Sequence, residues 1–153
     1  MRATGKLVGV VALAALLFPL AAHPASEEGD IQGVGHFQIP EWFKVSFLNL
    51  PQDLKAAAEA DKKLLLVWYQ EGCPYCERLI NTNFSQQEIA DYTRAHFDTI
   101  ALNLWGSRRV TSLDGSTATE KALGKQFDVQ FTPTLQFLDA SGEVVARLDG
   151  YYP

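Results

Sequence analysis

The sequence predicts an α/β fold in which helices flank a central mixed sheet. Two mainly apolar runs of strand length, at residues 64–69 and 98–104, are separated by helical segments. Strands joined through helices run parallel to each other. Further runs at residues 134–138 and 143–148 flank the turn sequence at residues 139–142, which predicts an antiparallel hairpin. One parallel pair and one antiparallel pair would make the sheet mixed.

Four helical segments complete the predicted order of helix, strand, helix, helix, strand, helix, strand, strand. Residues 51–63 are rich in strong helix formers, and residues 77–80 form a second candidate helix. Ser85 and Thr117 each stand three residues before a glutamate, which is the spacing of a capping box. This spacing predicts helices that run to about residues 95 and 127. The stretch at residues 107–116 is interpreted as a polar loop.

Composition limits the possible functions. The chain has 153 residues, 47% of them hydrophobic and 20% charged, which suits one globular domain. The formal net charge of −5 argues against nonspecific binding to nucleic acid, which needs a basic face. With two cysteines in total, Cys73 and Cys76, neither a four-cysteine zinc site nor a framework of disulfides between distant segments is possible.

The N-terminus has the pattern of a secretory signal. Arg2 and Lys6 precede an uncharged apolar stretch over residues 7–22, and Ala22 or Ala25 could end the cleaved segment. An uncleaved membrane anchor is the alternative, but a spanning helix needs about 20 apolar residues. We therefore predict a signal peptide at residues 1–25, a flexible leader at 26–39 and one domain at 40–153. An exported cysteine pair can be oxidised.

The two cysteines are the strongest functional signal. The C-x-x-C motif follows a buried strand directly and opens a helix. A helix N-terminus has unpaired N–H groups and a partial positive charge, which stabilise a thiolate at Cys73. Pro74 suits the first helical turn because its missing N–H would be unpaired there. Cys76 lies one turn further on the same face, within reach for a disulfide.

This arrangement predicts thiol–disulfide exchange. The Cys73 thiolate would attack a partner disulfide, and Cys76 would resolve the mixed disulfide. Two other interpretations stay open. The pair could be a structural disulfide, although so short a loop restricts the unfolded chain little. It could also supply two soft ligands for a metal such as Cu(I).

The sequence resembles the thioredoxin-fold superfamily and, more narrowly, the periplasmic thioredoxins of sulfur-oxidation loci, the SoxW type. The resemblance covers residues 40–153. The segments that carry it are PEWFKVSFLNL, LLLVWYQEGCPYCERL, NLWGSRRVTSLDG and FDVQFTPTLQFLDASGEVVARLDGYYP. The redox motif and the TPT motif are specific to the superfamily, whereas the first and third segments favour the narrower subgroup.

The resemblance implies a thioredoxin-like domain and a site. Thr132–Pro133 would be a cis peptide beside the cysteines, and the backbone of Thr132 would pair with a substrate chain. Pro74 and Tyr75 would contact substrate as well. The implied protein is a periplasmic monomer that reduces protein or sulfur-compound disulfides, receives electrons from a membrane thiol donor, and uses no cofactor or metal. We expect no nucleic-acid partner and no stable membrane insertion after removal of the signal.

Three departures from the family pattern matter. Val67 stands where thioredoxins commonly place a buried aspartate, so the base for Cys76 is unassigned; Glu71, Glu77 or water could serve. Gly72 replaces a common tryptophan. The sequence also stops at residues 150–153, where the fold usually adds a helix. Either the sequence is truncated or one sheet face is less covered, and we predict that the C-terminal helix is missing.

The dipeptide between the cysteines leaves the direction of electron flow open. Proline and tyrosine match the glutaredoxin motif, and glutaredoxins have potentials between those of thioredoxin and strong oxidants. A disulfide-forming oxidant and a glutaredoxin-like reductase are therefore alternatives. A non-catalytic metal-handling or adaptor protein with the same fold is a third.

Overall fold

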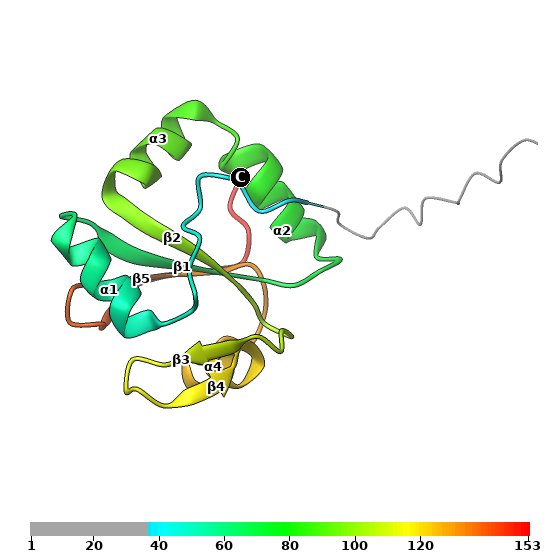
Figure 1. Cartoon of the computed structure of the whole chain (residues 1–153). Helices are drawn as coiled ribbons and strands as arrows, with labels where there is room; N and C mark the ends of the chain where they lie inside the picture. The colour runs from blue at the N-terminus through cyan, green and yellow to red at the C-terminus, as the bar shows by residue number, and fades with distance from the viewer. Residues whose placement is uncertain (1–36) are drawn as a thin grey trace, which may run out of the picture. The chain divides into compact units, whose positions relative to one another are not determined.

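The computed structural model describes residues 37–153 (Figure 1). The predicted signal peptide and most of the predicted leader lie outside the described residues. In chain order the elements are α1 (Leu50–Glu59), β1 (Lys63–Tyr69), α2 (Pro74–Arg78), the π-helical η1 (Leu79–Asn83), α3 (Gln87–His96), β2 (Phe97–Asn103), β3 (Arg109–Thr111), β4 (Thr117–Thr119), α4 (Glu120–Gln126), β5 (Thr134–Leu138) and β6 (Val144–Asp149). Within this part of the chain, no helix has the length and apolar character to cross a membrane.

The main sheet is mixed, as predicted. Its strand order is β2-β1-β5-β6, with β1 and β2 parallel, and β5 antiparallel to both β1 and β6. The central strand β1 is buried over five consecutive residues because helices cover both faces of the sheet. A continuous apolar run is the sequence pattern of such a strand.

Alternate residues of β1 enter two separate apolar clusters. Leu64, Leu66 and Trp68 pack with residues of α1 and α4 on one face, whereas Leu65 and Val67 pack with residues of η1 and α3 on the other. The apolar packing of the helices therefore divides between the two faces of the sheet. The strand ends at Tyr69, a few residues before the cysteine motif begins at Cys73.

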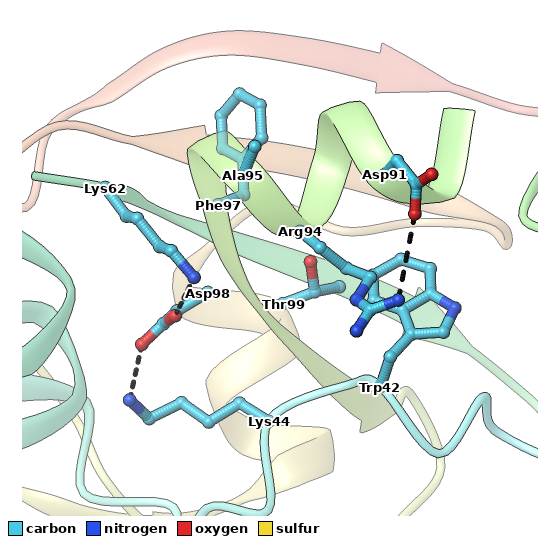
Figure 2. Close-up of a pocket in the computed structure, with 9 residues that line it drawn as sticks. All are labelled: Trp42, Lys44, Lys62, Asp91, Arg94, Ala95, Phe97, Asp98 and Thr99. Carbon is cyan, nitrogen blue, oxygen red and sulfur yellow. Dashed lines mark hydrogen bonds and ion pairs between the residues drawn. The ribbon is translucent and has the colours of Figure 1, made fainter. Parts of the chain in front are cut away.

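The edge strand β2 is covered by the segment that precedes α1. The backbone N–H of Lys44 donates to the carbonyl of Thr99 in β2 at 2.7 Å. The ammonium groups of Lys44 and Lys62 both pair with the carboxylate of Asp98, beside a cavity of about 590 Å³ (Figure 2). An edge strand with a paired backbone and charged flanks is a poor template for pairing with another chain.

Two capping predictions were wrong in detail. The Ser85 hydroxyl donates back to the carbonyls of Asn81 and Thr82 at the end of η1, so α3 begins at Gln87 with no side-chain cap. The final carbonyls of the π-helical segment need donors, and both the Ser85 hydroxyl and the Gln86 side-chain amide supply them. Thr119, not Thr117, caps α4: its hydroxyl accepts from the backbone N–H of Ala122 at 3.2 Å.

The stretch at residues 107–116 is not simply a loop, which corrects another prediction. It contains β3, which pairs with β4 in a two-stranded antiparallel sheet. Each strand has three residues, and only Val110 among them is fully buried. Each strand has a single apolar residue between two polar ones, and an alternation this short does not identify a strand from the sequence.

After β6, residues 150–153 are irregular. An apolar cavity of about 280 Å³ lies between η1, α3, β5 and β6. Leu148 and Tyr152, which line this cavity, remain substantially exposed. One face of the sheet is therefore covered incompletely at this end.

A buried hydrogen bond joins β1 to β5. The Trp68 indole N–H donates to the Gln136 amide oxygen at 2.8 Å, and the Gln136 amide nitrogen donates to the Phe127 carbonyl at 2.9 Å. Trp68 is fully buried, and Gln136 is 2% exposed. Neither the Trp68 indole N–H nor the Gln136 amide oxygen can hydrogen-bond to solvent instead, so each depends on the other as its partner.

We predict that Trp68→Phe lowers the free energy of unfolding by about 2 kcal/mol, because it leaves the buried Gln136 oxygen without a donor. Chemical denaturation followed by circular dichroism measures this loss. The double variant Trp68→Phe/Gln136→Met removes both partners and should recover part of it. Equal stability of the wild type and Trp68→Phe would show that the hydrogen bond contributes nothing.

Candidate active site

The cysteine motif lies in the turn between β1 and α2. Cys73 is the residue that caps α2, and Pro74 occupies the first helical turn. Gly72 has φ +74°, a left-handed conformation that side chains strongly disfavour, which explains a glycine immediately before Cys73. The backbone N–H of Cys76 donates to Cys73 Sγ at 3.1 Å. The local backbone therefore delivers a donor to one sulfur.

Cys73 and Cys76 form a disulfide, with their Cα atoms 5.2 Å apart. Cys73 is 4% exposed and Cys76 is 1% exposed. The structure is thus the oxidised form of the site. Both cysteines are therefore largely covered, and Cys73 is the slightly more exposed residue.

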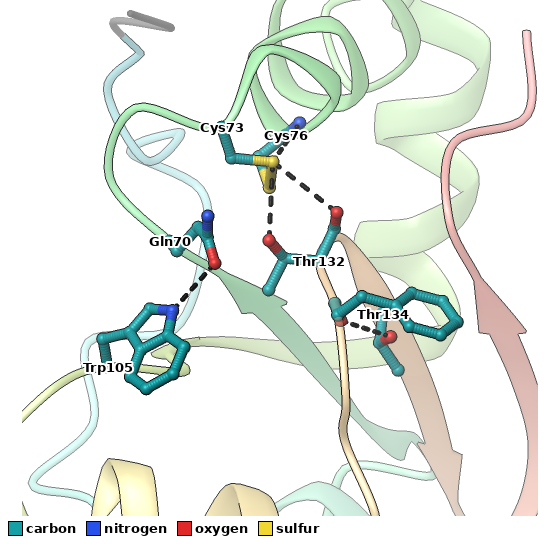
Figure 3. The surroundings of a disulfide bond; sticks show 7 residues. Gln70, Cys73, Cys76, Trp105, Thr132 and Thr134 are labelled. Atoms are coloured by element: carbon teal, nitrogen blue, oxygen red, sulfur yellow. Dashed lines mark hydrogen bonds between the residues drawn. A yellow bond between two sulfur atoms is a disulfide. The ribbon is translucent and has the colours of Figure 1, made fainter.

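The Thr132–Pro133 loop lies against the disulfide (Figure 3). The peptide bond between these residues is cis, as the resemblance implied. The Thr132 hydroxyl lies 3.5 Å from Cys73 Sγ and is oriented to donate to it, and the Thr132 carbonyl oxygen lies 3.6 Å from the same sulfur. The loop is anchored by Thr134, whose hydroxyl lies 3.0 Å from both the Phe131 carbonyl and the Asp149 carboxylate.

Pro74 and Tyr75 lie on the surface beside the disulfide. The Tyr75 ring stacks on Tyr151, with centroids 6.4 Å apart, and the Arg78 guanidinium lies 5.7 Å from its centroid. These contacts fix the ring while 54% of the side chain stays exposed. All six residues predicted for the site therefore come together, although their roles toward a substrate stay predictions.

No carboxylate within residues 37–153 hydrogen-bonds to either cysteine. Val67 is buried in the apolar cluster that packs against η1 and α3. Glu71 is exposed and Glu77 is half-buried at the start of α2. The base for Cys76 is therefore still unassigned. In the same part of the chain, no group of three or more histidine, cysteine, aspartate or glutamate side chains is placed to hold a metal ion.

A family model described as a thioredoxin-like domain matches residues 50–153. The chain belongs to this thioredoxin-like family. No curated protein matches it significantly. Among solved structures it is similar to a thioredoxin-fold protein from Helicobacter pylori, with 31% identity and a TM-score of 0.53 over 61% of this chain and 62% of that one. The match thus spans less than two thirds of the Helicobacter protein.

Another similar structure is a putative disulphide isomerase from Bacteroides thetaiotaomicron, with 32% identity and a TM-score of 0.55 over 69% of this chain and 78% of that one. A thioredoxin from Thermus thermophilus has 23% identity and a TM-score of 0.51 over 69% of this chain and 75% of that one, which supports the fold. Within this thioredoxin-like domain, the geometry of the cysteine turn makes it the candidate active site.

Sequence reasoning missed a buried carboxylate beside the site. Glu120 is 1% exposed and accepts from the backbone N–H groups of Asn103 and Arg108 and from the Arg108 guanidinium. The hydrogen bond to Glu120 raises the pKa of Arg108 above its ordinary value. The glutamate was interpreted as part of a capping box, and nothing in the sequence shows that a β2–β3 loop surrounds it.

Tyr69, the last residue of β1, has a pKa raised above its ordinary value, chiefly because burial disfavours the phenolate. Arg108 acts in the opposite direction. Tyr69 is therefore protonated at neutral pH, as an ordinary tyrosine is. Its ring packs edge-on against Phe37, with centroids 5.5 Å apart, so this residue forms a wall of the domain beside the motif.

We predict that Thr132→Val slows alkylation of reduced Cys73 by iodoacetamide at neutral pH by about threefold, because the hydrogen bond from the hydroxyl to the thiolate is lost and less of the thiol is ionised. The reaction is measured in a Cys76→Ser background, in which Cys73 is the sole thiol. Thr132→Ser keeps the hydroxyl and serves as the matched control. Equal rates for the valine and serine variants would mean that the hydroxyl does not act on the thiolate.

Proposed function

We propose that this protein is an exported thiol–disulfide oxidoreductase that reduces protein or sulfur-compound disulfides through Cys73 and Cys76. The observation that carries the proposal is the environment of Cys73 Sγ. This sulfur caps a helix, accepts a backbone N–H from Cys76 and lies beside the Thr132 hydroxyl. The Bacteroides relative, described as a putative disulphide isomerase, supports chemistry of the same class.

The first step needs a thiolate at Cys73. In the reduced protein, two donors from different elements would stabilise its negative charge: the Cys76 N–H and the Thr132 hydroxyl. The thiolate attacks one sulfur of the substrate disulfide. A bond forms between Cys73 and that sulfur, and the other substrate sulfur leaves as a thiolate that takes a proton from water.

The second step releases the substrate. Cys76 loses its proton and attacks Cys73 Sγ, three residues away on the adjacent turn. The Cys73–Cys76 disulfide forms, and the second substrate sulfur leaves as a thiolate. Two electrons have then passed from the protein dithiol to the substrate disulfide. The product is the oxidised protein, which is the state of the structure.

A further cycle needs a reductant of the dithiol class. We propose that a membrane thiol donor supplies these electrons outside the reducing cytosol. The apolar stretch at residues 7–22 supports export as a signal peptide. The segments PEWFKVSFLNL and NLWGSRRVTSLDG support membership of the SoxW type, with periplasmic location and a monomeric working form.

The two proposed roles of the cysteines lead to a trapping prediction. Cys76→Ser should accumulate a mixed disulfide between Cys73 and a model disulfide protein, because the second step is blocked. Non-reducing electrophoresis detects the adduct. Cys73→Ser, the matched control, should form no such adduct and lose disulfide reduction. Stoichiometric Cu(I) binding by a wild type that performs no exchange would instead favour a metal-handling protein.

The equilibrium potential tests the direction of electron flow. We expect a value near that of thioredoxin, about −270 mV, or between it and the glutaredoxin range of about −200 to −230 mV. Thiol titration followed by tryptophan fluorescence measures it, since Trp105 lies close to the disulfide (Figure 3). A value near −120 mV would mean that the protein donates disulfides, and the proposed direction would be wrong.

A further inference from the structure

Three exposed aromatic side chains belong to segments that adjoin the redox site, each from a different part of the chain. Tyr75 follows Pro74 in α2, Phe131 precedes Thr132, and Trp105 follows β2. They are 54%, 53% and 62% exposed, respectively. Aromatic rings that keep so much apolar area in water around a reactive sulfur are suited to contact a partner.

Trp105 differs from the other two because hydrogen bonds fix it at both ends of the residue. Its indole N–H donates to the Gln70 side chain at 2.9 Å, and its backbone N–H donates to the Asn103 side chain at 3.0 Å. The Lys121 ammonium lies 4.5 Å from the ring centroid, in a cation–π contact. A side chain held in this way loses little entropy when a ligand packs on it.

The loop that carries Trp105 is fixed as well. Glu120 binds the backbone on both sides of the loop, at Asn103 and Arg108. A side chain on Gly106 would collide with the Glu120 carboxylate, so the loop can approach this group only with a glycine there. The buried carboxylate therefore holds the loop against the start of α4.

The position of Trp105 relative to the disulfide follows from Gln70. The carbonyl of Gln70 accepts the backbone N–H of Cys73 at 3.4 Å, while its side chain accepts from Trp105. Figure 3 shows Gln70 lying between Trp105 and the cysteines. The indole is thus attached to the redox turn by one intervening side chain.

We propose that Trp105 is a specificity-determining residue, which selects polypeptide disulfides that carry a large apolar side chain within two residues of the reactive cysteine. This inference rests on the proposed function. While Cys73 attacks the substrate sulfur, a neighbouring substrate side chain packs on the exposed indole. Trp105 does not take part in bond making or breaking, so small disulfides without such a side chain gain nothing from it.

The test uses two short cyclic peptides, each closed by one disulfide and identical except for Phe or Ser beside one cysteine. Chromatography after acid quenching measures their rates of reduction by the reduced full-length protein. The wild type should reduce the Phe peptide about fivefold faster than the Ser peptide, the ratio that one aromatic contact supplies. Trp105→Ala should abolish this preference, and Trp105→Phe should keep most of it.

Two controls separate a substrate contact from a structural role. Tyr92, on α3, is 61% exposed, and Tyr92→Ala removes a comparably exposed ring and should leave the preference unchanged. Hydroxyethyl disulfide, which has no side chains, should react equally fast with the wild type and Trp105→Ala. A variant that slows this probe as much as the peptides would overturn the inference, because Trp105 would then act by holding Gln70 and the redox turn.

The remaining outcomes are also distinguishable. A wild type that reduces hydroxyethyl disulfide but does not discriminate between the peptides overturns the role of Trp105 and leaves the proposed function intact. A Trp105→Ala variant that keeps the preference does the same. A wild type that reduces none of the three disulfides overturns the proposed function and, with it, this inference.

Discussion

The hydrogen-bonded registers of β1 with its two neighbours decide which side chains meet at the disulfide. Trp68 pairs with Thr134 in β5, so the end of β1 adjoins the start of β5 and the Thr132–Pro133 loop reaches Cys73. Tyr69 pairs with Asn103 in β2, which brings the loop of Trp105 to the same end of the sheet. A shift of one residue in either register would turn the buried side chains of β1 to the wrong face, so apolar packing holds the site in place.

Buried polar side chains have different roles next to the two strands that flank β1. On the β5 side, the hydrogen bond from Trp68 to Gln136 lies in the core on one face of the sheet and satisfies groups that water cannot reach. On the β2 side, Glu120 collects its donors from a loop at the edge of the site. The donors around a buried carboxylate stay in place because moving one of them away leaves the buried charge less well paired.

The order of the main strands and helices could be predicted from the sequence. The wrong predictions arose where nearby backbone groups compete for the same side-chain hydroxyl. The run at residues 64–69 predicted β1 because burial on both faces demands continuous apolar residues. Ser85 and Thr117 misled because a hydroxyl binds whichever backbone group is nearest, and tertiary contacts decide which one that is. In the site, the cysteine spacing predicted the disulfide, and family resemblance located Thr132. The capping-box spacing at Glu120 and the segment that contains Trp105 did not reveal the roles of these two residues, since those roles depend on strand registers that bring distant segments together.

Cys73 and Thr132 are separated by 59 positions in the sequence, so the hydroxyl reaches the sulfur only after the chain has folded. The disulfide itself spans three positions and can close in an unfolded chain. Folding and redox state are consequently linked thermodynamically. Whatever free energy the folded site adds to the Cys73 thiolate appears equally as extra stability of the reduced protein and as a more positive potential of the pair. A site that stabilises the Cys73 thiolate more strongly would therefore make a weaker reductant, and the Thr132 hydroxyl contributes to that balance.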